Sequence, residues 1–262
     1  MAGKQVGVID ARGRTLDPCP AEKAERLVSS GRAVLVSERP PIIQLDRAVE
    51  IPEPAPESKV NPAGAGARIL LHICCAPCGT YTINRLRQLE FEVSGFWYNP
   101  NIHPWAEHER RRSCLEEYAT QIDLPVIWHP GYEMPAFLRQ VSGNEAFRQR
   151  CAHCYKMRLA ETARQAKARG YDAFTTTLLI SPYQDQDMIR RIGDRVAQIA
   201  GVKFYFENFR RGWSERSRLT KEYDLYRQSY CGCIYSEWER FNSAQIDTIL
   251  PAQGNGSMWQ GE

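Results

Sequence analysis

The chain has 262 residues, of which 43% are hydrophobic and 25% are charged, and its formal net charge is +3. This ordinary globular composition allows one domain of about 180 residues together with a smaller unit. No stretch approaches the roughly 20 apolar residues of a membrane helix, and no apolar run follows a basic start as in a secretory signal. We therefore expect a cytoplasmic protein, in which thiols stay mostly reduced and serve metal or redox chemistry.

The first 50 residues predict a small α+β domain. Short apolar runs alternate there with one helical segment, which Gly31 ends. Residues 51–67 are rich in proline, alanine and glycine and lack apolar periodicity, which is typical of a linker. Cys19 stands alone between two prolines, and we interpret it as an ordinary thiol. The expected strands are residues 6–9, 33–36 and 42–45, and the expected helix is 21–30.

Residues 68–240 predict a Rossmann-like, doubly wound and mainly parallel sheet, because strands and helices alternate with short connections. Residues 69–73 form a continuous apolar run, as expected for a strand buried on both faces. The polar, glycine-containing residues 241–262 predict a frayed tail. The expected strands are 69–73, 93–98, 125–128, 174–178 and 202–206, and the expected helices are 80–89, 106–122, 151 or 154 to 168, 185–199 and those flanking 231–233.

Seven of the nine cysteines fall in three short clusters. Chance burial would scatter cysteines along the chain, so the clusters indicate a shared centre, either a metal site or a dithiol that changes redox state. The first cluster follows the first strand of the larger domain directly, where ligand sites of doubly wound sheets lie. The clusters are Cys74-Cys75-Ala76-Pro77-Cys78, Cys151-Ala152-His153-Cys154 and Cys231-Gly232-Cys233.

The first two clusters supply four candidate ligands of one [4Fe-4S] cluster. Adjacent Cys74 and Cys75 rarely close a relaxed disulfide, and both can reach one centre only if the backbone turns at the following Ala-Pro pair. Cys151 and Cys154 have a two-residue spacing at a helix start, where the backbone favours thiolate. A structural zinc with the same four ligands is the alternative.

The third cluster indicates a second centre. Cys231 and Cys233, one residue apart, can bind another metal, or they can form a strained disulfide of the labile, reducible kind. Cys78 could join them as a third ligand and leave an open position for substrate. Alternatively, Cys75 and Cys78 have the spacing of a dithiol oxidoreductase, although this function would leave the second and third cysteine clusters unexplained.

Arginines and aromatic residues interleave in the larger domain. This mixture suits a structured RNA, whose phosphates meet arginine and whose unstacked bases meet aromatic rings. A solvated helix face is the alternative. The basic residues are Arg110, Arg111, Arg112, Arg148, Arg150, Arg210, Arg211, Arg216, Arg218 and Lys221, and the aromatic residues are Trp105, Phe209, Trp213, Tyr223 and Tyr226.

Several of these motifs, in this order, resemble the QueH epoxyqueuosine reductases over about residues 68–240. The resemblance implies a nucleotide-hydrolase-like Rossmann fold, a [4Fe-4S] cluster without cobalamin, and reduction of epoxyqueuosine in a tRNA anticodon to queuosine. The motifs are Leu70-Leu71-His72-Ile73 with the first cysteine cluster, Tyr98-Asn99-Pro100-Asn101-Ile102-His103-Pro104, the second cluster with Arg158-Leu159, Phe174-Thr175-Thr176-Thr177-Leu178 with Ile180-Ser181-Pro182, and Tyr226-Arg227-Gln228-Ser229-Tyr230 with the third cluster and Ile234-Tyr235-Ser236.

The resemblance also implies roles for the cysteines. Cluster ligands would be Cys74, Cys75, Cys151 and Cys154, and Cys231 with Cys233 would be a redox-active pair or ligands of an adjacent mononuclear iron. Some members of the family carry aspartate where this chain has Cys78. An electron donor would be a further partner, and no membrane is involved.

Four residues in strand-end loops are candidates to hold the substrate base. Their positions place them near the expected site, and a purely structural role in turns is the alternative. They are Tyr98, Asn99, Asn101 and Arg227.

Residues 1–50 are similar to the small RRXRR-type domain that begins some transposon-encoded RNA-guided nucleases. The similarity rests on segments such as Val8-Ile9-Asp10, Gly13-Arg14 and Ser30-Gly31-Arg32-Ala33. The family's Pro-Leu-Met-Pro core reads here as Thr15-Leu16-Asp17-Pro18. We expect an accessory module that grips RNA.

Two other functions compete with the reductase. A tRNA sulfur-transfer enzyme of the same fold class would carry a glycine-rich phosphate loop after the first strand, and this chain has only Gly79 there. A zinc-stabilised, non-catalytic RNA-binding module would use the same thiols. The identity of the metal separates this second alternative from the reductase.

Overall fold

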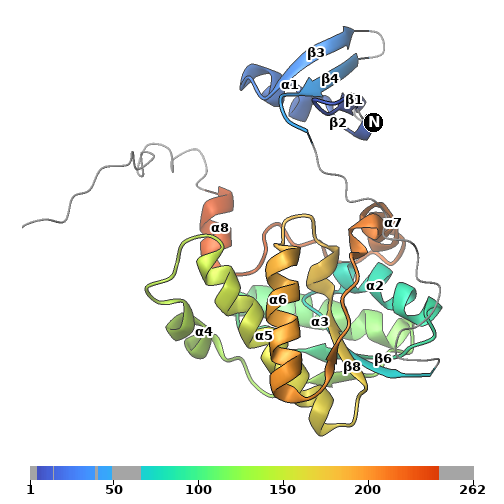
Figure 1. Ribbon diagram of the computed structural model, residues 1–262, viewed down its shortest axis with the longest axis vertical. Coiled ribbons are helices and arrows are strands. Elements are labelled where there is room, and N and C mark those ends of the chain that lie inside the picture. The colour runs from blue at the N-terminus through green and yellow to red at the C-terminus, as the bar shows by residue number, and fades with distance from the viewer. Residues whose placement is uncertain (1–4, 14, 39–40, 49–65, 242–262) are drawn as a thin grey trace, which may run out of the picture. The chain divides into compact units, whose positions relative to one another are not determined.

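The computed structural model describes residues 5–13, 15–38, 41–48 and 66–241, and the chain separates into two units, Met1–Ser58 and Lys59–Glu262 (Figure 1). Most of the predicted linker and almost all of the predicted tail lie outside the described residues. Each unit has a hydrophobic core of its own.

The first unit is a four-stranded sheet with one helix, in the strand order β2-β1-β4-β3. Strands β1 and β4 are parallel, and the other two pairs are antiparallel. Our prediction missed β2, because its sequence contains two prolines; at the edge of a sheet their missing N–H groups are tolerated. Cys19 is buried in this core, as an ordinary thiol would be. The elements are β1 (Gln5–Ile9), β2 (Thr15–Pro20), α1 (Ala21–Ser29), β3 (Ala33–Glu38) and β4 (Pro41–Leu45).

The second unit contains a five-stranded sheet in which every pair of neighbours is parallel. The strand order is β7-β6-β5-β8-β9, so the first strand in the chain is the central one. Ile69, Leu70 and Leu71 of β5 are fully buried, as the continuous apolar run predicts for a strand covered on both faces. The strands are β5 (Arg68–His72), β6 (Glu92–Trp97), β7 (Val126–Trp128), β8 (Ala173–Thr176) and β9 (Lys203–Phe204).

Helices cover both faces of this sheet, which confirms the doubly wound class. Figure 1 shows α5 and α6 side by side in front of the sheet, with α2 and α3 behind it. The prediction missed α4, which is only 8 residues long. The helices are α2 (Ala76–Gln88), α3 (Trp105–Gln121), α4 (Met134–Val141), α5 (Gln149–Ala168), α6 (Gln186–Ala200), α7 (Trp213–Glu222) and α8 (Ile234–Phe241).

Two element boundaries differ from the prediction at the ends that matter for the site. Helix α2 begins at Ala76, not at residue 80, because Pro77 stands in the first helical turn, where its missing N–H group costs nothing. Strand β8 ends at Thr176, not at 178, since the 3₁₀ helix η1 (Thr177–Ile180) follows at once. The earlier start of α2 places Cys78 in its first turn, and the earlier end of β8 places Thr177 at the start of η1. Both residues therefore stand close to the end of β5.

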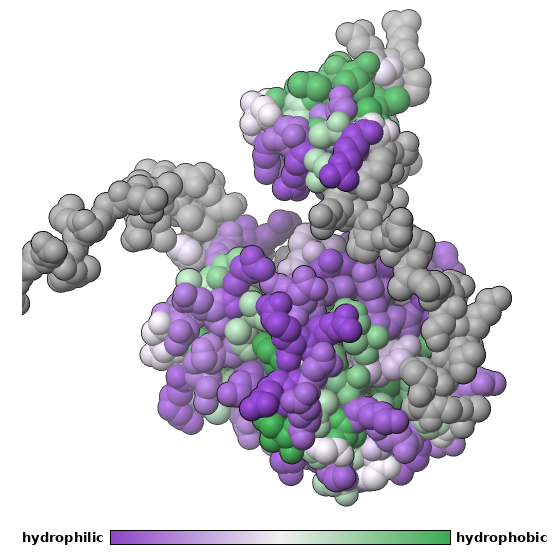
Figure 2. Space-filling view, viewed as in Figure 1, coloured by the Kyte–Doolittle hydropathy of each residue, from purple (hydrophilic) through white to green (hydrophobic). Residues whose placement is uncertain are grey.

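The topology fixes where a site can form. After β5 the chain adds β6 and β7 on one side and later adds β8 and β9 on the other, so the order reverses between β5 and β8. Open α/β sheets bind ligands beyond the carboxyl ends of the strands at such a point. In the view of Figure 2, the surface of this unit is mostly hydrophilic with smaller apolar areas. Among the described residues, no helix is both long and apolar enough to span a bilayer.

Candidate metal and redox site

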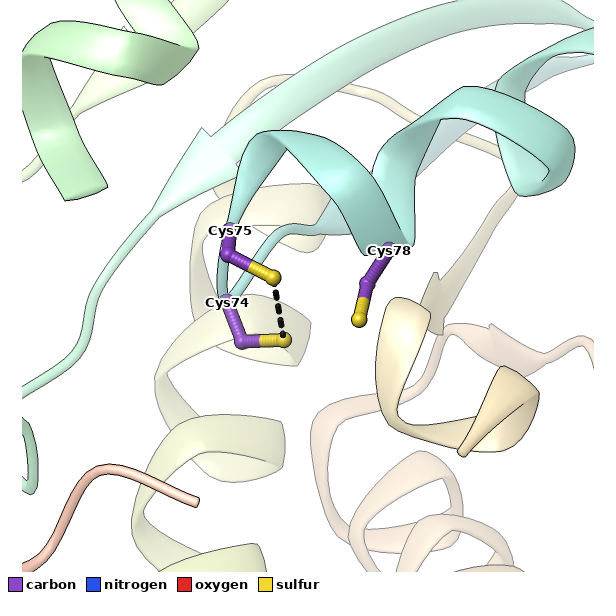
Figure 3. A group of neighbouring side chains, drawn as sticks. All are labelled: Cys74, Cys75 and Cys78. Carbon is purple, nitrogen blue, oxygen red and sulfur yellow. Dashed lines mark hydrogen bonds between the residues drawn. The ribbon is translucent and has the colours of Figure 1, made fainter. Parts of the chain in front are cut away.

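Three thiols gather where the central strand ends (Figure 3). Cys74 follows β5, Cys75 precedes α2, and Cys78 lies in the first turn of that helix. Their sulfur atoms all lie within 4.8 Å of one another, and those of Cys74 and Cys75 are 3.9 Å apart. Because residues three apart at a helix start share a face, Cys75 and Cys78 reach the same side. We call Cys74, Cys75 and Cys78 the first thiol group.

Thr177, on the other side of the switch point, fixes the position of Cys74. Its Oγ1 atom accepts a hydrogen bond from the Cys74 backbone N–H at 3.1 Å. The Thr177 hydroxyl also donates to Cys74 Sγ at 3.4 Å. The early end of β8 makes this contact possible, since Thr177 stands at the start of η1. The first thiol group is therefore held by both central strands.

The three thiols of the first group differ in pKa. Hydrogen bonds with Cys75 and Cys78 hold the pKa of the Cys74 thiol well below its usual range. The hydrogen bond with Cys74 raises the pKa of Cys75 well above its usual range and that of Cys78 to about 12. The arrangement stabilises a thiolate at Cys74. Three soft sulfur donors this close together suit a thiophilic metal such as iron or zinc.

The other two cysteine clusters meet in a second thiol group, which comprises Cys151, Cys154, Cys231 and Cys233. Cys154 and Cys233 are buried in one apolar cluster. Burial, together with the nearby thiols of Cys231, Cys233 and Cys151, raises the pKa of Cys154 to about 12 against the opposing charge of Arg158. The Cys231 residue is exposed, whereas Cys233 is buried, and both are free thiols. Burial nevertheless raises the pKa of the Cys231 thiol, so the exposed part of this residue does not put its sulfur atom in open solvent.

The buried side chain of Arg158 connects the two thiol groups. Arg158 is only 2% exposed, and its Nη2 atom donates to Cys154 Sγ at 3.1 Å. Burial opposes its charge, but interactions with Cys154, Cys231 and Cys74 raise the pKa of Arg158. Within the described part of the chain, no carboxylate forms an ion pair with it. Since a buried cation needs a counter-charge, the site fits an anionic group bound by these thiols.

A second buried arginine holds the turn that carries Cys231. The guanidinium of Arg111 donates to the backbone oxygens of Cys231 at 3.0 Å and Tyr230 at 3.1 Å, and Glu107 accepts from its Nε at 2.7 Å. Gly232 adopts a φ of 142°, which disfavours any other residue. These contacts fix the backbone of the turn.

Three of the arginines predicted to face RNA are therefore misassigned. Arg111, Arg150 and Arg216 are almost fully buried, so none of them can meet a phosphate at the surface. Arg216 lies near the first thiol group, where its charge lowers the pKa of Cys78 against the larger effect of hydrogen bonding to Cys74. The sequence gives no sign of this, because basic residues near aromatic rings look alike whether they face solvent or thiols.

Several buried polar atoms near the thiols lack a hydrogen-bond partner. Among the described residues, they include Asn99 Oδ1, both side-chain polar atoms of Asn101, and Gln228 Oε1. The Gln228 amide donates to Cys75 Sγ at 3.1 Å, and the Asn99 amide donates to the Ile73 backbone oxygen at 2.9 Å. Because buried polar groups are normally paired, these atoms indicate a ligand that completes the site.

The predicted residues thus fall in different places. The four thiols expected to hold one cluster are divided between the groups, with Cys74 and Cys75 in the first and the other two in the second, and Cys78 lies with the first. Asn99 adjoins the end of β5, whereas the Tyr98 hydroxyl donates to Glu133 at 2.7 Å. Arg227 is exposed.

Sequence reasoning missed the polar residues that contact the thiols. Gln184 donates to Cys231 Sγ at 3.4 Å and accepts from the Tyr155 hydroxyl at 2.7 Å. Gln228 and Arg158 stand inside the motifs that carried the resemblance, so that pattern was the signal that could have singled them out. Gln184 lies two residues beyond such a motif, and no local pattern marks it.

Comparison with known proteins gives one consistent result. The family described as "Epoxyqueuosine reductase QueH" matches residues 69–239. A protein of that name from Dehalococcoides mccartyi is 40% identical over 174 residues, which cover 66% of this chain and 94% of the relative. Another from Thermotoga maritima is 39% identical over 180 residues, covering 66% and 91%. A third, from Streptococcus pyogenes, is 33% identical over 178 residues, covering 64% and 69%. The matched region contains both thiol groups.

Proposed function

This chain belongs to the QueH family of epoxyqueuosine reductases, and we propose that it reduces epoxyqueuosine to queuosine at the wobble position of tRNA, the last step in making that nucleoside. The reaction breaks both C–O bonds of the epoxide, leaves a carbon–carbon double bond, and releases the oxygen as water. It consumes two electrons and two protons. The observation that carries the proposal is the meeting of all three cysteine clusters around one buried cation, Arg158.

We further propose that Cys74, Cys75, Cys151 and Cys154 hold a [4Fe-4S] cluster. Arg158 supports this ligand set, because it donates to Cys154 and interacts electrostatically with Cys74, one thiol from each group. A thiolate-bound iron–sulfur cluster is anionic, which supplies the counter-charge that the guanidinium needs. The chemistry that such a cluster supplies is transfer of one electron at a time.

Cys231 and Cys233 are proposed to be the redox-active pair. Two thiols that close to a disulfide release two electrons and two protons, which is what the reaction consumes. A disulfide across a single intervening residue is strained, and strained disulfides are readily reduced again. A separate electron donor would restore the dithiol through Cys231, which is exposed. If the pair instead binds a mononuclear iron, Cys78 is its proposed partner.

The polar atoms without partners are proposed to bind the modified base. Asn99 Oδ1 and both polar atoms of Asn101 lack hydrogen bonds within the described residues, and Asn101 adjoins the Gly232 backbone. Tyr98 would support this loop, since its backbone oxygen lies 3.2 Å from His72 Nε2. Arg227, which is exposed, would meet an RNA phosphate.

We also propose that the reaction takes place in the cytoplasm.

The first unit is proposed to be an accessory module that binds RNA. Removing residues 1–67 tests the role of the unit. We expect weaker binding of tRNA by the shortened chain, with conversion of bound tRNA unchanged. Equal affinity of both chains for tRNA would contradict the role.

The test of the function uses the full chain purified without oxygen. Iron, acid-labile sulfide and zinc are measured per chain, and the protein is then incubated with tRNA that carries epoxyqueuosine and a chemical reductant. We expect about four irons with matching sulfide, or slightly more iron than sulfide, and conversion to queuosine. One zinc without sulfide, and no conversion, would favour the non-catalytic RNA-binding alternative.

The role of Cys233 is tested in the same assay. Cys233→Ala should keep its iron and sulfide and lose conversion, whereas Cys19→Ala, in the core of the other unit, should change neither. A Cys233→Ala protein that converts its substrate at the full rate would rule out this cysteine as a redox partner.

A further inference from the structure

A pocket of about 210 Å³ lies beside the second thiol group. Two segments form it, one at the start of α5 and the other between η1 and α6. Its volume is below the roughly 300–1,000 Å³ of sites that enclose whole drug-sized molecules. It therefore suits a single flat ring system rather than an entire nucleotide. The residues that line it are Phe147, Arg148, Cys151, Tyr155, Tyr183, Gln184 and Asp185.

Two aromatic rings of the pocket are unusually exposed. Phe147 is 62% exposed and Tyr183 is 79% exposed, and each stands on a different segment. Each ring also has a neighbour that orients it: the guanidinium carbon of Arg150 lies 5.6 Å from the Phe147 ring centre, and Trp213 meets Tyr183 edge-on at 6.3 Å. Proteins that hold unstacked bases use rings presented in this way.

The inner side of the pocket reaches the thiols. Cys151 is one of the lining residues, and the Gln184 amide donates to Cys231 Sγ at 3.4 Å. The Tyr155 hydroxyl, which donates to Gln184 Oε1 at 2.7 Å, fixes the orientation of that amide. A group that enters the pocket would thus meet Cys151 directly and would contact Gln184, whose amide is bonded to Cys231 of another cluster.

A cation stands among the lining residues. The side chain of Arg148 is 67% exposed and forms an ion pair with Asp185, which also accepts a hydrogen bond from the Met188 backbone N–H at 3.0 Å. The ion pair restrains the guanidinium while leaving part of it in solvent. An exposed arginine beside aromatic rings is the combination that binds a nucleotide through its phosphate and its base.

We propose that this pocket receives the base of the wobble nucleotide, stacked between Phe147 and Tyr183, with its modified group directed toward Cys151 and Cys231 and a flanking phosphate outside the pocket near Arg148. This inference rests on the proposed function. Asn99 and Asn101 were already proposed to bind the base. The pocket adds Phe147 and Tyr183, which the sequence did not single out, as the residues that position it.

The test uses a fluorescent RNA and the full, metal-loaded chain. An anticodon stem-loop with 2-aminopurine at the wobble position is titrated, because stacking on an aromatic ring quenches this base. In parallel, KM and kcat are measured with tRNA that carries epoxyqueuosine. The variants are Phe147→Ala, Tyr183→Ala and the double variant, with Tyr183→Phe to preserve stacking. The control is Phe241→Ala, which removes a ring that is 65% exposed but does not line the pocket.

Each alanine variant should weaken binding and raise KM by at least about fivefold, the lower range for loss of one base–aromatic stack, with little change in kcat. Quenching should disappear in the double variant and persist in Tyr183→Phe and Phe241→Ala. Unchanged quenching and KM in the double variant would overturn the pocket assignment, as would equal losses in Phe241→Ala. A wild-type protein that quenches through these rings but never forms queuosine would leave the pocket standing and refute the proposed function.

Discussion

The two thiol groups differ in how the fold holds them. The first group stands on the central strand and the first turn of α2, with Cys75 and Cys78 fully within the core and Thr177 bonded to Cys74. The second group joins the start of α5 to a turn before α8, a helix that has no buried residues. We infer that the first group, together with Cys151 and Cys154 of the second, retains a bound centre. Cys231 and Cys233, on the turn before α8, are left to react, and Cys231 is the exposed residue of that pair.

Cys75→Ala is the variant for which we expect the largest loss of iron and of turnover. Removing a sulfur from the first thiol group should abolish retention of iron and lower turnover at least about 100-fold, more than losses at groups that only support a ligand. Iron per chain and conversion of tRNA are measured together. Cys114→Ala, a partly buried thiol on α3, is the control and should retain both iron and turnover. Retention of iron by Cys75→Ala would show that this group does not hold the centre.

Substitution of Gly232 should damage the turn that carries Cys231 and Cys233 and leave the proposed cluster ligands intact. At a φ of 142°, an added Cβ would lie 3.2 Å from Asn101 Nδ2 and 3.2 Å from Ile102 Cγ1. We expect Gly232→Ala to displace the turn at a local cost of about 1–3 kcal/mol and to reduce turnover about tenfold or more while iron stays bound. Gly170→Ala, at a positive φ of 69° beyond the end of α5, is a matched control whose turnover should not change. Loss of iron in Gly232→Ala would mean that the turn is not separable from the residues that hold the iron.

Arg158→Met should affect the stability of the metal-free protein and of the metal-bound protein in opposite directions. Without the bound centre, the guanidinium is a buried cation with no carboxylate partner among the described residues, so its replacement should leave the free energy of unfolding unchanged or raise it by about 1–4 kcal/mol. With the centre bound, the variant should be less stable than the wild type and lose iron faster. Thermal unfolding of both forms, with and without iron, measures this. Destabilisation of the metal-free form would show that Arg158 has a purely structural role.

The smallest effect is expected at Asn101. Because neither of its buried polar atoms has a partner within the described residues, Asn101→Leu should not reduce stability and should raise KM for tRNA several-fold. Asn208→Ala is the contrasting control, since Asn208 accepts hydrogen bonds from the Arg210 backbone and the Gln186 amide. That variant should lower stability and leave KM unchanged. Lower stability with an unchanged KM in Asn101→Leu would exclude substrate binding there.

Much of the fold follows from periodicity, because long apolar runs such as residues 69–73 leave few alternatives. All five strands of the larger sheet overlap the segments expected to be strands, although three of them begin one residue earlier, and the first cysteine cluster stands at the switch point. Short or proline-containing elements such as β2 and α4 were missed, since their local patterns are weak.

The grouping of the thiols was beyond sequence reasoning. Spacing along the chain relates Cys75 to Cys78, but only tertiary packing brings the 151–154 and 231–233 clusters together. The same holds for Arg158 and Gln184, whose contacts join segments from different parts of the sheet. Residue type indicated metal and redox chemistry, whereas the partners of each thiol depend on the fold.

The most direct test of the account is a single turnover without an external electron donor. Loaded protein is mixed with an equal amount of tRNA that carries epoxyqueuosine, the mixture is quenched in acid, free thiols are alkylated, and the peptide that contains Cys231 and Cys233 is analysed by mass spectrometry. We predict that a disulfide between these two residues accumulates in step with queuosine, while Cys74 and Cys75 form none. Queuosine that appears while Cys231 and Cys233 both remain free thiols would contradict their assignment as the reacting pair beside the four proposed cluster ligands.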